Sequence, residues 1–79
     1  MKISKKCAES IFDAYDIKSL SEIVESETFN EQATNSIVYG FCVRCGFMED
    51  SIEPDAYNCH CEECETDTVF SIMAIMGII

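Results

Sequence analysis

The sequence predicts a small α+β protein in which N-terminal helices pack on strands of the C-terminal half. Apolar residues recur at helical spacing near the start of the chain, and no glycine or proline occurs before residue 40. From residue 36 onward, β-branched and aromatic residues become frequent, as they are in strands. A chain of 79 residues suits one domain. We therefore expect a single domain, 1–79, with a helical part at 1–37 and a strand-rich part at 38–79.

Residues 4–35 are predicted to be mainly helical. The first helix has one apolar face, formed by Ile3, Cys7, Ile11, Phe12 and Tyr15, and Cys7 is expected in the core. A second short helix is expected to begin at Ser19, where Ser19 and Glu22 form a capping box. The segment 26–36 is predicted as a loop followed by a polar turn of helix capped by Asn30.

Three strands are predicted in the C-terminal half, at 36–41, 46–53 and 66–70. The second alternates acidic and apolar residues, which indicates one exposed face. A turn containing Pro54 follows it. Pairs of cysteines separated by two intervening residues lie between these segments. A three-stranded zinc ribbon has the same order of elements: strand, cysteine pair, strand, turn, cysteine pair and strand.

The cysteines are better explained as metal ligands than as disulfides. The N-terminal segment lacks the apolar stretch of a secretory signal, so we expect a cytoplasmic protein in a reducing environment. Cys42 and Cys45 are followed by Gly46, which suits the positive φ of a zinc knuckle. Cys61 and Cys64 repeat the gap after fifteen intervening residues. These four are predicted to hold one structural Zn²⁺ per chain.

Cys59 is then a surplus thiol, and His60 is its neighbour in sequence. Cys59 could be an alternative ligand, a redox-sensitive thiol beside the metal, or a small, partly buried hydrophobic residue, and the last is preferred. His60 could replace a cysteine in a mixed site. We expect it instead to face away from Cys59 and Cys61 on an extended segment.

The sequence predicts that the protein is not an enzyme. Four cysteines close the coordination shell of zinc, whereas a catalytic zinc keeps an open position. His60 and Glu62 match the H-x-E pattern of zinc deaminases, but no P-C-x-x-C follows. No second histidine exists to build a nucleophile and base couple.

The net charge of −10 disfavours direct binding to nucleic acid. Four lysines oppose seven acids in residues 1–40, giving −3, and Arg44 alone opposes eight acids in residues 41–79, giving −7. Such a surface repels phosphates and attracts a basic protein surface. A helix-turn-helix interpretation of the N-terminal half is also disfavoured against a plain helical cover for the metal module, because the segment with Gln32 and Asn35 carries no lysine or arginine.

Residues 38–79 resemble a group of small zinc-ribbon proteins encoded by bacteriophages and prophages. The shared features are the two cysteine pairs, an E-P-D turn at 53–55, a T-V-x-S segment at 68–71, and an apolar tail ending in Gly77, Ile78 and Ile79. The resemblance implies the same four ligands, a ribbon fold and a viral origin. His60 stands where the group usually has tryptophan, Cys59 is additional, and Glu65 takes a place where glycine is common.

The C-terminal segment 69–79 has nine hydrophobic residues in eleven. It is shorter than the roughly 20 residues that a membrane span needs, so no membrane attachment is expected. A helix beginning at Ser71 would place Ile72, Ile75, Met76 and Ile79 on one face. Burial under the N-terminal helices is the preferred explanation, and the alternative is a homo-oligomer or partner contact through 69–79.

These features lead to three functional hypotheses. The first is a phage-encoded, acidic, protein-binding module that inhibits or modulates a host nucleic-acid-handling protein, as anti-CRISPR and other anti-defence proteins do. The second is a transcription or replication accessory ribbon that contacts nucleic acid through Lys2, Lys5, Lys6 and Lys18. The third is a structural subunit assembled through the apolar tail.

Overall fold

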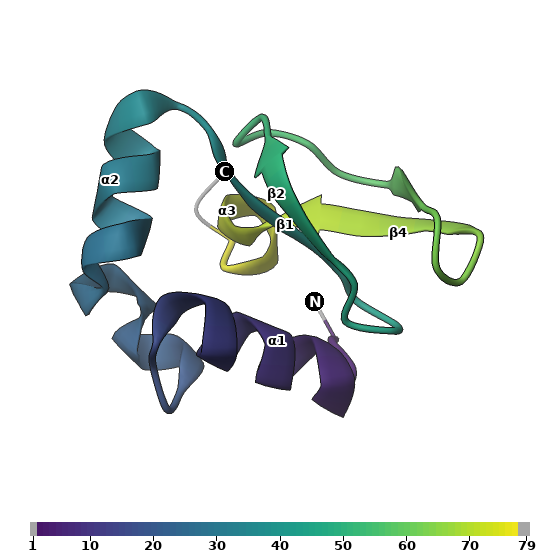
Figure 1. Ribbon diagram of the computed structural model, residues 1–79, viewed down its shortest axis with the longest axis horizontal. Coiled ribbons are helices and arrows are strands. Elements are labelled where there is room, and N and C mark those ends of the chain that lie inside the picture. Colours follow the sequence, from purple (N-terminus) through teal and green to yellow (C-terminus); the bar gives the residue numbers. More distant parts are fainter. Residues whose placement is uncertain (1, 78–79) are drawn as a thin grey trace.

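The computed structural model of the protein describes residues 2–77. Helices make up the first part of the chain and an antiparallel sheet the second (Figure 1). In order, the elements are α1 (Lys5–Tyr15), the 3₁₀ helix η1 (Leu20–Glu25), α2 (Glu27–Asn35), β1 (Val38–Cys42), β2 (Met48–Ile52), β3 (Cys59–Cys61), β4 (Thr66–Ser71) and α3 (Ile72–Ile75). The predicted α+β class is confirmed.

The sheet has four strands in the order β2-β1-β4-β3, with every neighbouring pair antiparallel. The prediction of three strands was therefore wrong by one short strand, β3. Its three residues are two cysteines and a histidine, which carry no strand signal in composition. Pairing to β4 creates the strand, with Cys59 opposite Val69 and Cys61 opposite Thr66 across an irregular register.

The main core lies between the helices and the two central strands. α1 and α2 contact β1, while α3 contacts β1 and β4 (Figure 1). Three residues of the predicted apolar face, Cys7, Ile11 and Tyr15, are buried. The Tyr15 ring lies 6.2 Å from the Phe29 ring and 6.2 Å from the Phe41 ring, measured between centroids. Aromatic side chains therefore join both helices to the central strand.

The helix starts differ in detail from the sequence predictions. η1 follows Ser19, but Ser19 makes no capping hydrogen bond through its side chain. Glu22 instead accepts hydrogen bonds from the Lys18 amide, at 3.2 Å, and from the Ser19 hydroxyl, at 3.1 Å. The predicted capping box is therefore not formed: only the return bond from Glu22 is present, and it reaches the Lys18 amide, one residue before Ser19.

The predicted cap at Asn30 was wrong, because α2 begins one turn earlier. Ser26 is its N-cap, and the Ser26 hydroxyl accepts the Phe29 amide at 3.4 Å. The same hydroxyl donates to the Tyr15 carbonyl at 3.2 Å, so the cap also joins the end of α1 to the start of α2. Asn30 lies inside α2 and donates to the Ser26 carbonyl at 2.9 Å.

A second, smaller apolar cluster lies beside the cysteine pairs. Its buried members are Cys42, Cys61 and Val69, with partly buried Phe47 and Ile52 packed against them. Gly40 makes this packing feasible, because a Cβ at that position would overlap the Cδ1 atom of Ile52. The cysteine pairs therefore pack against apolar side chains rather than facing open solvent.

The apolar tail, for which the sequence left helix or strand open, begins as the short helix α3 directly after Ser71. The Ser71 hydroxyl caps it by accepting the Ala74 amide at 3.0 Å. Ile72 is buried in the main core with Cys7 and Ile11, and Met73, Ile75 and Met76 pack against that core. The predicted place of Ile79 on this face lies outside the described residues. Within residues 2–77, no helix combines the length and apolarity needed to cross a membrane.

Candidate metal centre

Two turns of similar shape carry the predicted ligands. Cys42 ends β1 and Cys61 ends β3, and each is followed three residues later by its partner, Cys45 or Cys64. In the first turn the Gly46 amide donates to the Cys42 carbonyl at 3.0 Å, and in the second the Glu65 amide donates to the Cys61 carbonyl at 2.8 Å. The residue that closes each turn has positive φ: 82° at Gly46 and 55° at Glu65.

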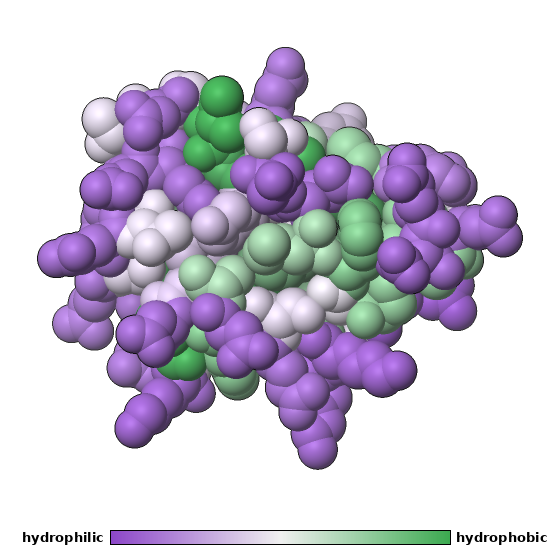
Figure 2. All heavy atoms as spheres, viewed as in Figure 1, coloured by the Kyte–Doolittle hydropathy of each residue, from purple (hydrophilic) through white to green (hydrophobic). Residues whose placement is uncertain are grey.

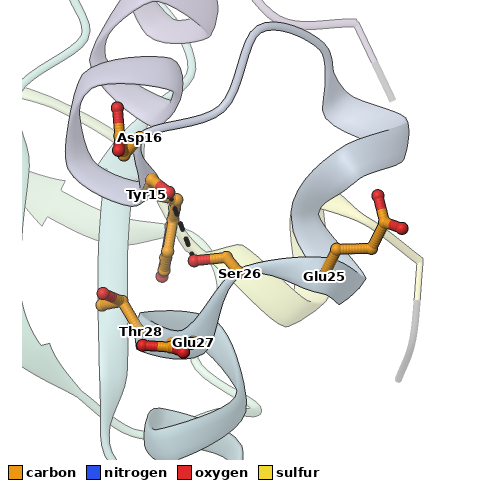
Figure 3. A pocket seen from close by; sticks show the side chains of 6 residues that line it. All are labelled: Tyr15, Asp16, Glu25, Ser26, Glu27 and Thr28. Atoms are coloured by element: carbon orange, nitrogen blue, oxygen red, sulfur yellow. Dashed lines mark hydrogen bonds between the residues drawn. The ribbon is translucent and has the colours of Figure 1, made fainter.

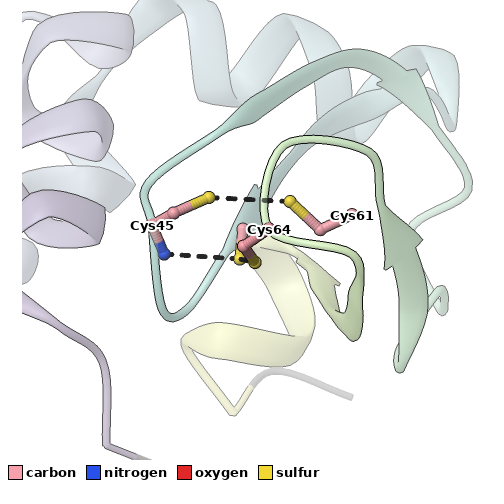
Figure 4. A group of neighbouring side chains, drawn as sticks. Cys45, Cys61 and Cys64 are labelled. Atoms are coloured by element: carbon pink, nitrogen blue, oxygen red, sulfur yellow. Dashed lines mark hydrogen bonds between the residues drawn. The ribbon is translucent and has the colours of Figure 1, made fainter.

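The two turns face each other and bring together the sulfurs of Cys42, Cys45, Cys61 and Cys64, which all lie within 4.8 Å of one another. Cys42 and Cys64 are 3.6 Å apart between Sγ atoms, and so are Cys45 and Cys61, which point toward each other in Figure 4. A tetrahedron with metal–sulfur bonds of about 2.3 Å has edges of about 3.8 Å. The sulfurs are therefore placed to bind one metal ion, consistent with a structural zinc.

The four thiols divide into two kinds by pKa. Burial raises the pKa of Cys42, but hydrogen bonds from the Cys45 amide, the Thr68 hydroxyl and the Arg44 amide outweigh it and lower the pKa to about 6. The Thr66 hydroxyl lowers the pKa of Cys64. Burial raises the pKa of Cys61.

Cys45, like Cys61, has a raised thiol pKa. The Phe47 amide lowers its pKa, but burial and the neighbouring thiols outweigh that effect and raise the pKa to about 12. A metal ion binds thiolates, so metal binding must displace protons from Cys45 and Cys61. Metal affinity is therefore expected to fall as the pH is lowered.

Neither surplus candidate joins this cluster. Cys59 is partly buried against the second apolar cluster, and its thiol lies 3.8 Å from the Tyr57 carbonyl. His60 is exposed, with Nδ1 at 3.4 Å from Asp67 Oδ1. Cys7 lies in the main core, where burial raises its thiol pKa to about 11.

Thiol reactivity should therefore reveal two classes of cysteine. With zinc bound, iodoacetamide is expected to modify Cys59 alone, whereas the four clustered thiols and Cys7 should react only when a chelator removes the metal and the fold opens. Peptide mass spectrometry after timed alkylation measures this order. Cys59→Ser is the control and should remove the fast reaction. Fast modification of Cys61 in the zinc-loaded protein, with Cys59 protected, would contradict the ligand assignment.

Two functional side chains that the sequence prediction missed lie on β4. The Thr68 hydroxyl is 3.0 Å from the Cys42 sulfur, and the Thr66 hydroxyl is 3.1 Å from the Cys64 sulfur. The only sequence signal is a T-D-T segment just after the second cysteine pair. That segment is equally typical of an ordinary strand, so the contact to sulfur could not be predicted.

The first turn is pressed against α1. The Ser10 hydroxyl donates to the Gly46 carbonyl at 2.6 Å, and a Cβ at Gly46 would lie 2.6 Å from the Lys6 carbonyl oxygen. Glycine is therefore required at position 46 for two reasons: the positive φ and the close approach of the Lys6 carbonyl.

The matched positions 46 and 65 give a test of this requirement. Gly46→Ala is expected to lower the free energy of unfolding by more than about 2 kcal/mol, because the strain of positive φ adds to the overlap with Lys6. Glu65→Gly removes a strained residue but adds unfolded-state entropy, so its effect is expected below about 1 kcal/mol. Urea unfolding at saturating zinc compares the two. Equal losses would contradict the role of the α1 contact.

A polar hollow of about 310 Å³ lies where α1, η1 and α2 meet. It is lined by Tyr15, Asp16, Glu25, Ser26, Glu27 and Thr28, and Figure 3 shows the Ser26 hydroxyl directed to the Tyr15 carbonyl. Its carboxylates do not form a metal-binding group. Within the part of the chain that the structure describes, the four cysteines form the one group of histidine, cysteine or acidic residues placed to hold a metal ion.

No family model, no curated protein and no solved structure matches this chain. The resemblance of residues 38–79 to phage zinc-ribbon proteins therefore stays a prediction. Function must be inferred from the chain's own fold, charges and cysteine cluster.

Proposed function

We propose that the protein is an acidic protein-binding module whose fold is stabilised by zinc. Four cysteines bind one zinc ion, and the fold that the metal stabilises presents carboxylates to a basic surface of a partner protein. The observation that carries the proposal is the combination of a closed four-cysteine cluster with an excess of acidic residues, fifteen against five lysines and arginines.

Zinc is the metal that best suits this donor set. Tetrahedral sites made of four thiolates are typical of structural zinc, and they leave no position for a substrate or water. Two of the sulfurs are buried, and the apolar cluster lies against them. The site is thus suited to holding β1, β3 and the two turns together, with no reaction assigned to it.

The carboxylates of the strand-rich half lie at the surface. Those exposed are Asp50, Glu53, Asp55, Glu62, Glu63, Glu65 and Asp67. Across residues 2–77 the single close contact between a basic and an acidic side chain is that of His60 with Asp67. Hydrophilic side chains also cover much of the face seen in Figure 2, around a band of apolar ones. Unbalanced carboxylates of this kind attract a cationic partner and speed its association at low salt.

Many basic protein surfaces bind nucleic acid, so an acidic module that occupies such a surface would compete with DNA or RNA. This is the physical basis for proposing inhibition or modulation of a host nucleic-acid-handling protein. The phage origin and the anti-defence role expected from the sequence belong to this proposal and rest on the resemblance and on charge.

Paired charge variants test the proposal. Zinc-loaded protein should capture a basic host protein, and the capture should weaken as salt rises. Glu62→Gln with Glu63→Gln should reduce the affinity, while Glu9→Gln with Asp13→Asn changes the net charge equally and should have a smaller effect. Affinity measured by calorimetry with the captured protein compares them. Retention of the wild-type protein on DNA at physiological salt would contradict the proposal.

One observation favours nucleic-acid binding as a second candidate. The Ser4 amide donates to the Val43 carbonyl at 2.8 Å, so the start of α1 lies beside the first turn. Exposed Lys5, Lys6 and Arg44 therefore occur at one end of the molecule. If this end contacts phosphates, replacing the three residues by alanine should weaken binding to single-stranded DNA, and the binding that remains should depend less steeply on salt.

A further inference from the structure

Thr66 and Thr68 form a hydroxyl pair at one edge of the metal centre. They lie two residues apart on β4, and their hydroxyl oxygens are 2.8 Å apart. Each oxygen also contacts a different sulfur, Cys64 at 3.1 Å and Cys42 at 3.0 Å. Two side chains thus span the Cys42–Cys64 edge, whose sulfurs are 3.6 Å apart. No threonine contact of this kind occurs at Cys45 or Cys61 among the described residues.

The number of protons fixes how this pair is arranged when the cysteines are thiolates. A thiolate only accepts hydrogen bonds, and each threonine hydroxyl supplies one proton. Two protons must therefore make three hydrogen-bond contacts: Thr68 with Cys42, Thr66 with Cys64, and Thr66 with Thr68. Cys42 is buried, with 0% of its surface exposed, so water cannot reach its sulfur. Cys64 is partly exposed, and water can solvate it.

We propose that Thr66 and Thr68 are positioning residues of the metal centre. Thr68 donates its proton to the Cys42 thiolate, and Thr66 shares its proton between the Thr68 oxygen and the Cys64 thiolate. This inference rests on the proposed metal binding. The two donors hold one edge of the tetrahedron in place and withdraw electron density from its sulfurs, in a protein whose charge is already strongly negative.

The proposal differs from a purely structural role for the threonines. Threonine is a good strand residue, and valine has the same branched shape with equal or better strand propensity. If the threonines serve only the strand, Thr68→Val should leave the metal centre unchanged. If the hydroxyl proton acts on the sulfur, valine should alter the metal centre while serine restores it.

Cobalt(II) titration of the full-length chain tests this, because cobalt reports on its sulfur ligands through thiolate-to-metal charge-transfer absorption. Thr68→Val is expected to move this absorption to lower energy and to weaken cobalt and zinc binding by about 10–100-fold in chelator competition. Thr68→Ser should match wild type in both readouts. Thr66→Val should give a smaller change in the same direction. Thr34→Val, on the exposed face of α2, is the control and should match wild type.

The position of the charge-transfer band is measured at saturating cobalt, so it does not depend on affinity. If Thr68→Val folds poorly, Thr66→Val provides a second test of the same prediction. A wild-type spectrum in Thr68→Val, or equal weakening in Thr68→Val and Thr68→Ser, would overturn the role of the hydroxyls while leaving metal binding intact. Failure of the wild-type chain to bind cobalt or zinc would overturn the proposed metal site and this inference with it.

Discussion

Replacing Cys61 by serine is expected to abolish stoichiometric zinc binding and to unfold the protein at room temperature. Cys61 is fully buried and supplies one of four sulfurs around a closed site. Structural zinc sites of this kind contribute apparent binding free energies of about 10–16 kcal/mol. A core as small as this one supplies only a few kcal/mol of net stability, so the fold cannot compensate for the loss.

Native mass spectrometry should show one zinc per chain for wild type and none for Cys61→Ser, and circular dichroism should show the loss of folded structure. Cys59→Ser is the matched control, since Cys59 belongs to the same strand, β3, but lies outside the cysteine cluster. It should keep both zinc and fold. Loss of zinc from Cys59→Ser, with retention by Cys61→Ser, would refute the ligand assignment.

Replacing Phe41 by alanine is expected to lower the free energy of unfolding by about 3–5 kcal/mol at saturating zinc. Phe41 is fully buried on β1, between β2 and β4. Its ring centroid lies 6.2 Å from that of Tyr15 and 6.4 Å from that of Tyr39. Truncation leaves a cavity where the helices meet the sheet, and the rigid strands on either side limit how far it can close.

Urea unfolding with excess zinc measures this loss. Phe12→Ala is the control, because Phe12 lies on α1 but is only partly buried, and its cost is expected near 1 kcal/mol. Phe41→Ala should still bind one zinc per chain, since its neighbour Cys42 keeps its place in the first turn. Equal losses in the two variants would contradict the assignment of Phe41 to the centre of the core.

The features that sequence predicted well are local ones. The apolar face of α1 follows from spacing alone, and Cys7, Ile11 and Tyr15 are buried as that spacing requires. The two turns of the metal centre are also local, because a pair of cysteines with two residues between them defines each turn. The fold determines only that the two turns come together around one site. Because the two cysteine pairs of a zinc ribbon are usually separated by about fifteen to twenty residues, the spacing in this chain predicted that they would.

The features that sequence missed depend on partners far away in the chain. β3 joins the sheet because β4 pairs with it, and composition alone does not distinguish its three residues, expected only to be extended, from a loop. In the structure Ser26, not the predicted Asn30, caps α2. The Ser26 hydroxyl also donates to the Tyr15 carbonyl, eleven residues away, and this contact supports the earlier helix start. The hydrogen bond between Thr68 and Cys42 spans 26 residues. Propensity and spacing carry no information about such contacts.

The attachment of α1 to the first cysteine turn has a consequence for how the molecule opens. The Ser4 amide and the Ser10 hydroxyl both donate to carbonyls of that turn, those of Val43 and Gly46. When the metal leaves and the turn loosens, α1 loses these two anchors at once. Amide hydrogens of α1 should then exchange with solvent through the same opening event as those of the turn, so that helix and metal centre form one cooperative unit.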